Sequence, residues 1–185
     1  MRIKLHNLKS VVTAFFLLAV FSGPLHAQAN EADLLKQLSE APESEASRLD
    51  RELGLVWDRS GSAAMDLLLS RGRAAMQAEN YGLAIEHFTA LTDHAPDFAE
   101  GWHARATAYF HADLYGPALD DLQRALILNP NNYNAMFGLG VLFREFGDYE
   151  RAAQAFAQVL DLHPYHENAT TALEQLRSEG IGLTL

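Results

Sequence analysis

Large apolar side chains, small side chains and prolines recur along residues 65–164 with a fixed step of 34 positions. The step holds over three consecutive units without an insertion or a deletion. A period of this length is typical of a repeat made of two antiparallel helices, because one such unit cannot bury its apolar face alone and must stack on the next. The recurring sets are Gly72/Ala106/Gly140, Tyr81/Tyr115/Tyr149, Ala84/Ala118/Ala152, Phe88/Leu122/Phe156, Leu91/Ala125/Val159 and Pro96/Pro130/Pro164.

Each recurring position has a physical role in such a helix pair. Two helices approach closely only where the facing side chains are small, so we expect the small residues of the first helices to meet the recurring alanines of the second. Larger side chains, such as Tyr109 and Phe156, fill the remaining space. Proline has no amide hydrogen and disfavours helix in the residue before it. Pro96, Pro130 and Pro164 are therefore expected to end the second helices.

Seven residues of the middle unit carry a resemblance to a known family. Their offsets match the tetratricopeptide pattern, so residues 63–166 resemble three tetratricopeptide repeats, at about 65–98, 99–132 and 133–166. The resemblance implies an all-α fold, a right-handed α-solenoid of helix–turn–helix repeats, and a non-catalytic scaffold that binds other proteins. The seven residues are Trp102, Ala106, Tyr109, Ala118, Leu122, Ala125 and Pro130.

Two repeats depart from the family pattern at their seventh position, where leucine is usual. Arg71 and Arg105 stand there. Because an arginine stem packs on apolar neighbours while its guanidinium reaches water, we expect both charges to be solvated. Asp120 and Asp121 are likewise expected on the solvated outer face of a second helix.

Residues 1–27 have the pattern of a secretory signal peptide. Basic residues precede an apolar run over 11–21, and small residues follow it up to Ala27. The run is half of the ~20 residues that a membrane-spanning helix needs, so we expect cleavage after Ala27, or after Ala29, and no stable membrane span thereafter. An uncleaved anchor is the alternative. The signal predicts a bacterial periplasmic protein, with full secretion as the alternative.

The segments that flank the repeats have helical spacing but not the 34-residue step. Residues 28–62 predict two short acidic helices, which we interpret as a helical cap on the exposed edge of repeat one. A dimerisation or docking arm is the alternative. Residues 167–179 predict a C-terminal capping helix. The apolar tail, 180–185, is expected to be flexible, with packing in the groove or service as a C-terminal ligand as alternatives.

A stripe along each first helix is expected to face the hollow of a stacked array. It mixes large apolar with polar side chains and suits an extended peptide or an amphipathic helix, unless neighbouring repeats or the tail cover it. Some family members hold a C-terminal carboxylate there with Lys and Asn, a set that this stripe lacks. The predicted groove residues are Leu69, Arg73 and Met76, then His103, Thr107 and Phe110, then Asn134, Phe137, Val141 and Arg144.

The net negative charge limits the classes of partner that the protein is expected to bind. The chain has 14 basic and 24 acidic residues, and loss of residues 1–27, which hold three basic and no acidic residues, changes the net charge from −10 to −13. Such a surface repels nucleic acid and favours a neutral or basic protein or peptide partner. With no cysteine in the chain, stability is expected to come from helix packing.

No motif predicts catalysis. The six histidines after residue 27 include no pair at the i, i+4 spacing of a helical zinc site, and no Gly-x-Ser-x-Gly elbow is present. We therefore expect no enzyme activity, no metal and no cofactor. The second functional hypothesis is a self-assembling structural module in which the helix pair of residues 28–62 drives homo-oligomer formation.

Overall fold

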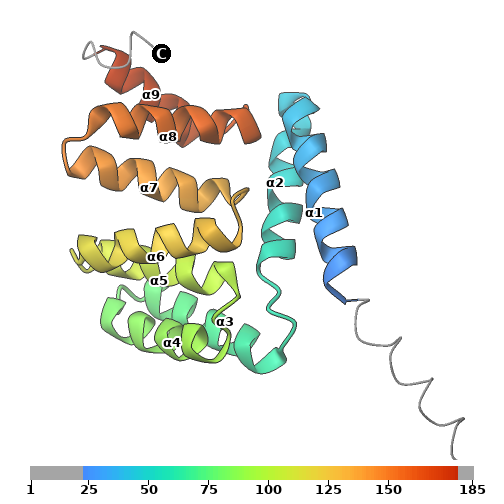
Figure 1. Ribbon diagram of the computed structural model, residues 1–185, viewed down its shortest axis with the longest axis vertical. Coiled ribbons are helices and arrows are strands. Elements are labelled where there is room, and N and C mark those ends of the chain that lie inside the picture. Colours follow the sequence, from blue (N-terminus) through green and yellow to red (C-terminus); the bar gives the residue numbers. More distant parts are fainter. Residues whose placement is uncertain (1–22, 179–185) are drawn as a thin grey trace, which may run out of the picture.

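The computed structural model describes residues 23–178, with side chains from Asn30 onwards, and all regular structure within that segment is α-helical (Figure 1). No helix in it combines the length and apolar character that crossing a membrane requires. The helices are α1 (Gly23–Glu40), α2 (Glu43–Trp57), α3 (Ala63–Gln77), α4 (Tyr81–His94), α5 (Ala99–His111), α6 (Tyr115–Leu128), α7 (Tyr133–Glu145), α8 (Tyr149–Leu162) and α9 (Glu167–Ser178).

Three helical hairpins, α3–α4, α5–α6 and α7–α8, stack in chain order and form the expected solenoid (Figure 1). Each second helix ends two residues before its proline, at His94, Leu128 and Leu162. α9 follows the last hairpin and buries its apolar stripe against α8; the stripe consists of Ala169, Ala172, Leu173 and Leu176. The predicted all-α solenoid is thus confirmed.

The turn inside each hairpin repeats the same backbone geometry. Glu79, Asp113 and Gly147, 34 residues apart, have φ values of 55°, 59° and 74°. This left-handed conformation costs little at glycine and more at the other two residues. The next residue is the N-cap of the second helix, and the side chains of Asn80 and Asp148 accept hydrogen bonds from backbone amides in the first turn.

The closest approach inside a repeat joins a glycine of the first helix to a phenylalanine of the second. A Cβ added at Gly72 would lie 2.2 Å from the Phe88 ring, and one added at Gly140 would lie 2.6 Å from the Phe156 ring. Repeat two has Ala106 and the smaller Leu122 at these positions, both buried. The two positions therefore share one volume, and a larger residue on one helix requires a smaller one on the other.

Arg105 and Asp121 correct the expectation of solvated charges. The guanidinium of Arg105 donates two hydrogen bonds to the carboxylate of Asp121, at 2.7 and 2.9 Å, and a third to Thr92 Oγ1. Both charged side chains are almost fully buried. A carboxylate from α6 thus meets the arginine that replaces the usual leucine of α5. Arg71, in contrast, is exposed as expected.

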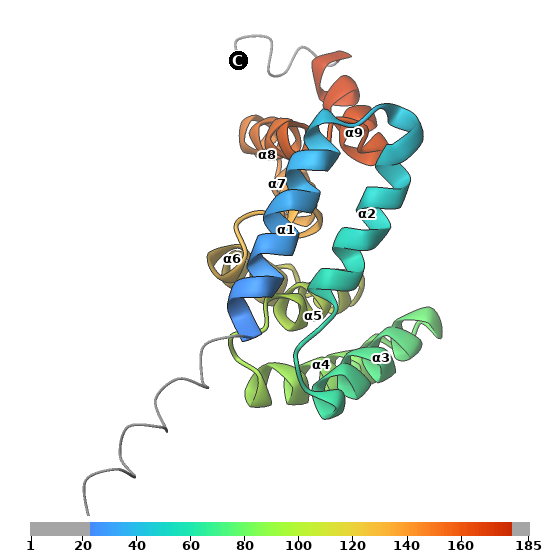
Figure 2. The same cartoon turned by 90° about the vertical axis from the view of Figure 1, so that its right-hand side faces the viewer.

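The N-terminal hairpin α1–α2 does not cover repeat one, and this expectation was wrong. It stands upright beside the stack (Figures 1 and 2), and its apolar side chains join those of repeat three and α9 in one core cluster. Tyr133 is fully buried at this junction: its hydroxyl donates to Asp50 at 2.7 Å, and its ring meets Trp57 edge-on at 4.9 Å. Glu31 accepts hydrogen bonds from Trp57 Nε1 and from Asn129.

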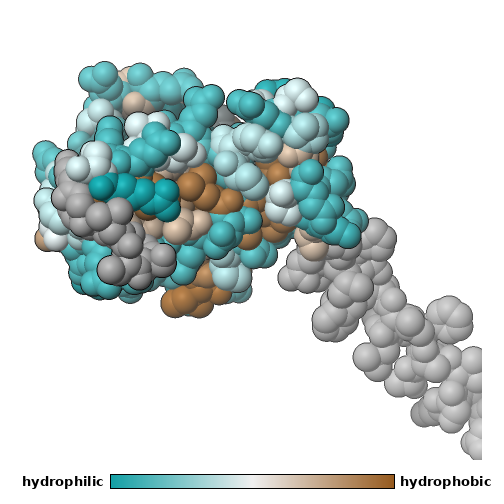
Figure 3. All heavy atoms as spheres, turned by 90° about the horizontal axis from the view of Figure 1, so that it is seen from above, coloured by the Kyte–Doolittle hydropathy of each residue, from teal (hydrophilic) through white to brown (hydrophobic). Residues whose placement is uncertain are grey.

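The hairpin therefore lies across the turns that connect one repeat to the next. Seen from above, one apolar area lies near the middle of the face and another at its lower edge, among mostly hydrophilic residues (Figure 3). The predicted signal peptide, 1–27, and the predicted flexible tail, 180–185, fall largely or wholly outside the described residues, and both remain predictions.

We predict that Gly140→Ala lowers the free energy of unfolding by about 1–3 kcal/mol, because the new methyl group overlaps the fully buried Phe156 ring. Urea titration followed by circular dichroism measures the loss. Gly82→Ala is the matched control: nothing lies within 4 Å of its added Cβ, and a gain of about 0.5–1 kcal/mol is expected in the helix.

The double variant Gly140→Ala, Phe156→Leu reproduces the pairing of repeat two. It should lose less stability than the sum of the two single variants, because the shorter leucine vacates the space that the methyl group needs. Strictly additive losses would contradict the idea of a shared volume.

Candidate functional site

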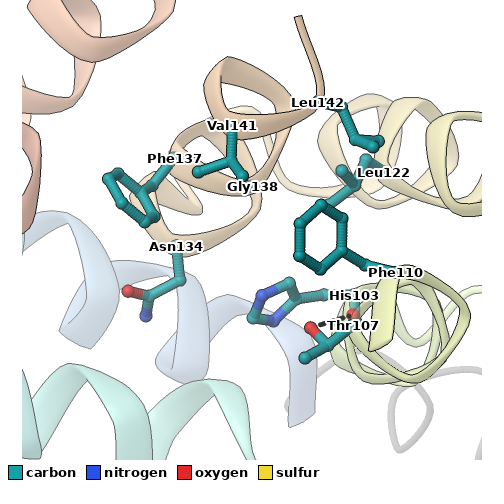
Figure 4. Close-up of a pocket in the computed structure, with 9 residues that line it drawn as sticks. All are labelled: His103, Thr107, Phe110, Leu122, Asn134, Phe137, Gly138, Val141 and Leu142. Atoms are coloured by element: carbon teal, nitrogen blue, oxygen red, sulfur yellow. Dashed lines mark hydrogen bonds between the residues drawn. The ribbon is translucent and has the colours of Figure 1, made fainter. Parts of the chain in front are cut away.

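An apolar cavity of about 420 Å³ opens between the first helices of repeats two and three, α5 and α7 (Figure 4). Phe110 of α5 and Phe137 of α7 stand on opposite sides of it, with Val141 between them. A concave site with mostly apolar walls and few polar groups is the usual form of a binding pocket. The full lining is His103, Thr107, Phe110, Leu122, Asn134, Phe137, Gly138, Val141 and Leu142.

Packing behind the walls fixes the two aromatic rings. Phe137 lies 5.4 Å from the ring of Phe156 and 5.2 Å from that of His166, measured between centroids. Phe110 lies 5.5 Å from Tyr115. Such side chains are held in position before any ligand arrives, and this lowers the entropic cost of binding.

The base of the cavity comes from the second helix of repeat two. A Cβ added at Gly138 would lie 3.3 Å from the side chain of Leu122, so the glycine allows Leu122 to approach α7. The stripe prediction missed Leu122, Gly138 and Leu142, because it considered only the outward positions of the first helices. A glycine inside the predicted helix was the available signal for a close approach.

A charged network lies at the His103 end of the cavity and links α3 and α5 to Asp58, the C-cap residue of α2. Arg73 of α3 donates to both carboxylate oxygens of Asp58, at 2.6 and 2.7 Å, and to Glu100 of α5 at 2.8 Å. The other oxygen of Glu100 lies 3.0 Å from His103 Nδ1. Glu100 is buried, so its two partners compensate its loss of hydration.

The network shifts the pKa values of its members. Burial acts against the ionised carboxylate of Glu100, but His103 and Arg73 outweigh burial, and the pKa of Glu100 is lowered. Burial likewise acts against the imidazolium of His103, yet the Glu100 carboxylate prevails and raises its pKa. Hydrogen bonding to Asp58 raises the pKa of Arg73. These charged groups pair with one another and link α3 to α5.

The structure brings six of the ten predicted groove residues together around this cavity: His103, Thr107, Phe110, Asn134, Phe137 and Val141. The other four lie elsewhere. Leu69 is 3% exposed, in the core of repeat one, and Met76 packs against the same cluster. Arg73 belongs to the charged network, and Arg144, in the last turn of α7, is not part of the lining.

The family model of the tetratricopeptide repeat matches this chain at residues 69–133 and 115–167, which together span more than half of its 185 residues. The chain belongs to the tetratricopeptide repeat family. Tetratricopeptide repeats are protein–protein interaction modules, and the cavity between α5 and α7 lies on first helices, the elements that line the hollow of such a repeat array.

Similar proteins come from bacteria and eukaryotes. A TPR repeat-containing protein of Rhizobium etli is 27% identical over 150 residues, which cover 80% of this chain and 74% of that protein. The first TPR domain of Spaghetti (RPAP3) bound to the HSP90 peptide SRMEEVD has a TM-score of 0.60 at 25% identity, over 62% of this chain and 91% of that chain. The second TPR domain of human RPAP3 with the HSP70 peptide SGPTIEEVD has a TM-score of 0.55 at 28% identity, over 58% and 90%.

A second cavity of about 590 Å³ adjoins the first beside the tetratricopeptide array. It lies between α2 and the start of α9, and Asn134 lines both cavities. Its lining is strongly polar: Glu43, Ser44, Ala46, Ser47, Asp50, Asn134, His163, Tyr165, His166, Glu167 and Asn168. The N-terminal hairpin, which lies outside the matched repeats, therefore forms one wall of the site.

Two histidines of the second cavity favour their neutral form. Burial lowers the pKa of His163 and of His166, whose rings lie 5.4 Å apart. His166 is also the cap of α9, because its Nδ1 accepts a hydrogen bond from the amide of Ala169 at 3.1 Å. Protonation of Nδ1 would remove this acceptor and place a positive charge at a helix N-terminus.

We therefore predict that acid weakens the tetratricopeptide fold at α9, and that His166→Asn removes part of this effect. A histidine whose folded pKa is lowered contributes stability that is complete above its unfolded pKa, about 6.5. That contribution is lost as the pH falls through the folded pKa. Asparagine caps a helix without titrating.

Urea titrations of both proteins at about pH 7.5 and about pH 5 measure the difference. The wild type should lose more unfolding free energy than the variant between the two conditions. His163 is present in both proteins, so the comparison isolates residue 166. Equal losses of unfolding free energy in the wild type and the variant would show that the His166 cap does not titrate in this range.

Proposed function

We propose that this protein is a non-catalytic interaction module of the bacterial periplasm that binds a peptide or helical segment of another protein in the cavity between α5 and α7. The observation that carries the proposal is the open apolar cavity between Phe110 and Phe137. An apolar recess with walls fixed by packing suits the apolar side chains of a peptide. Membership of the tetratricopeptide repeat family and the peptide-bound RPAP3 domains support the same function.

The mode of binding proposed here differs from capture of a C-terminal carboxylate. Arg73 is the only predicted groove cation of repeat one, and two carboxylates already hold it. Leu69, another position of the stripe, is buried in the core. We infer that apolar side chains of the ligand, and not its terminal carboxylate, supply most of the affinity.

The periplasmic location rests on the pattern of residues 1–27 and on the absence of cysteine. The related protein of Rhizobium etli, a bacterium, is compatible with it. We predict that a fusion of the full chain to alkaline phosphatase, an enzyme that is active only after export, has activity in a bacterial host. Loss of the residues from Arg2 to Ala27 should abolish this activity, and an equal activity without them would contradict export by this signal.

Self-assembly through the N-terminal helix pair was the second hypothesis from the sequence. The apolar side chains of this pair, including Leu38, Leu49 and Leu53, are buried against repeat three of the same chain. This arrangement favours peptide binding over self-assembly, because most apolar side chains of the pair already pack within the chain.

We predict that Phe110→Glu with Phe137→Glu abolishes binding of the partner in a pull-down while the protein stays helical. An apolar ligand could enter the cavity only by removing water from the two new carboxylates, which costs free energy. Thr107→Trp is a second variant that fills the cavity without adding charge. Its cost in stability should be small, since the Thr107 hydroxyl only donates to the carbonyl of His103 in its own helix.

Leu83→Glu with Ile127→Glu is the matched control. Leu83 is 39% exposed and Ile127 is 72% exposed, and neither residue lines the cavity. The control should retain the partner. Unchanged capture by both groove variants would rule out the cavity as the binding site.

A further inference from the structure

The apolar cavity and the polar cavity are neighbours, because Asn134 belongs to both linings. The first supplies apolar walls from α5 and α7. The second supplies polar groups from α2, α9 and the turn before α9. A peptide in the first cavity would therefore have the side chains of the second cavity beside it, on the other side of Asn134.

The second cavity is acidic. Glu43, Asp50 and Glu167 line it, and no lysine or arginine lines either cavity. Among residues 30–178, Glu43 and Glu167 have no ion-pair partner. Both stand in the first turn of a helix, where the helix dipole favours acidic side chains. Unpaired carboxylates around a concavity attract a cation.

A buried polar group in the same cavity lacks a partner. His163 is only 6% exposed and lines the second cavity, and its Nδ1 has no hydrogen-bond partner in the described part of the chain. A buried polar atom without a partner is uncommon in folded proteins. It is a second polar feature of this cavity wall, independent of the carboxylates.

We propose that the preferred ligand is a peptide segment with one large apolar side chain, followed or preceded within about two to four residues by lysine or arginine. The apolar side chain enters the cavity between Phe110 and Phe137. The basic side chain reaches the carboxylates of Glu43 and Glu167. This inference rests on the proposed function and adds the charge of the ligand to it.

The preferred charge is opposite to that of the peptides in the related solved structures. Those peptides, SRMEEVD and SGPTIEEVD, end in acidic residues. Here Glu43, Asp50 and Glu167 would repel such an end, and the arginine of repeat one is occupied by Asp58 and Glu100. The excess of acidic residues in the whole chain, 24 against 14 basic residues, acts in the same direction.

The test is a selection from a displayed library of random peptides of roughly twelve residues against the purified full chain. Peptides that also bind Thr107→Trp are removed, so that those retained depend on the groove. A retained peptide is then synthesised, and its affinity is measured by fluorescence polarisation together with a copy in which each Lys or Arg is replaced by Gln.

We expect the retained peptides to be enriched in an apolar residue with Lys or Arg at the stated spacing. The Gln copy should bind about five- to tenfold more weakly, and added salt should weaken the basic peptide more than its copy. Glu43→Gln with Glu167→Gln should cause a similar loss for the basic peptide only. The matched control, Glu86→Gln with Glu150→Gln, removes two exposed carboxylates that line neither cavity and should leave affinity unchanged.

The outcomes separate this inference from the proposed function. Groove-dependent peptides without a basic residue, or an equal loss in the Glu86/Glu150 control, would overturn the inference and leave peptide binding intact. Failure to retain any peptide that depends on the groove would overturn the proposed function, and the inference with it.

Discussion

The fold depends on how closely the two helices of a repeat can approach each other. In repeats one and three the first helix presents no side chain at Gly72 and Gly140, and a phenylalanine ring of the second helix occupies the space. This contact sets the spacing of each hairpin, and the hairpin spacing sets how the next one stacks. The 34-residue step in the sequence thus reflects one helix–helix contact that recurs in each repeat.

The apolar cavity between α5 and α7 accompanies a small variation in this helix packing. Repeat two uses Ala106 and Leu122 in place of glycine and phenylalanine, and Leu122 also reaches toward Gly138 of the next repeat. The side chain of Leu122 lines the cavity that opens between α5 and α7. The recess therefore opens between repeats two and three, where the packing partner inside the stack is smallest.

The sequence predicted the repeats well because their contacts are local and periodic. The prolines mark the helix ends, and six groove residues come from one stripe on two first helices. It failed where the partners lie on different helices and no spacing in the sequence links them. Nothing in the spacing around Asp50 indicates Tyr133, which lies 83 residues away, and nothing around Asp121 indicates Arg105, on another helix. Such pairs become visible only when the helices are placed in space.

Two kinds of side chain line the hollow of the array: ion pairs lie between α3 and α5, and apolar side chains lie between α5 and α7. Between α3 and α5 the hollow is closed by Arg73, which ties Asp58 to Glu100, while Leu69 is withdrawn into the core. Between α5 and α7 no such pair forms, because position nine of the stripe holds Thr107 and then Val141. The charged network therefore occupies the first interval, and the apolar cavity opens in the second, beside the acidic wall that α2 supplies.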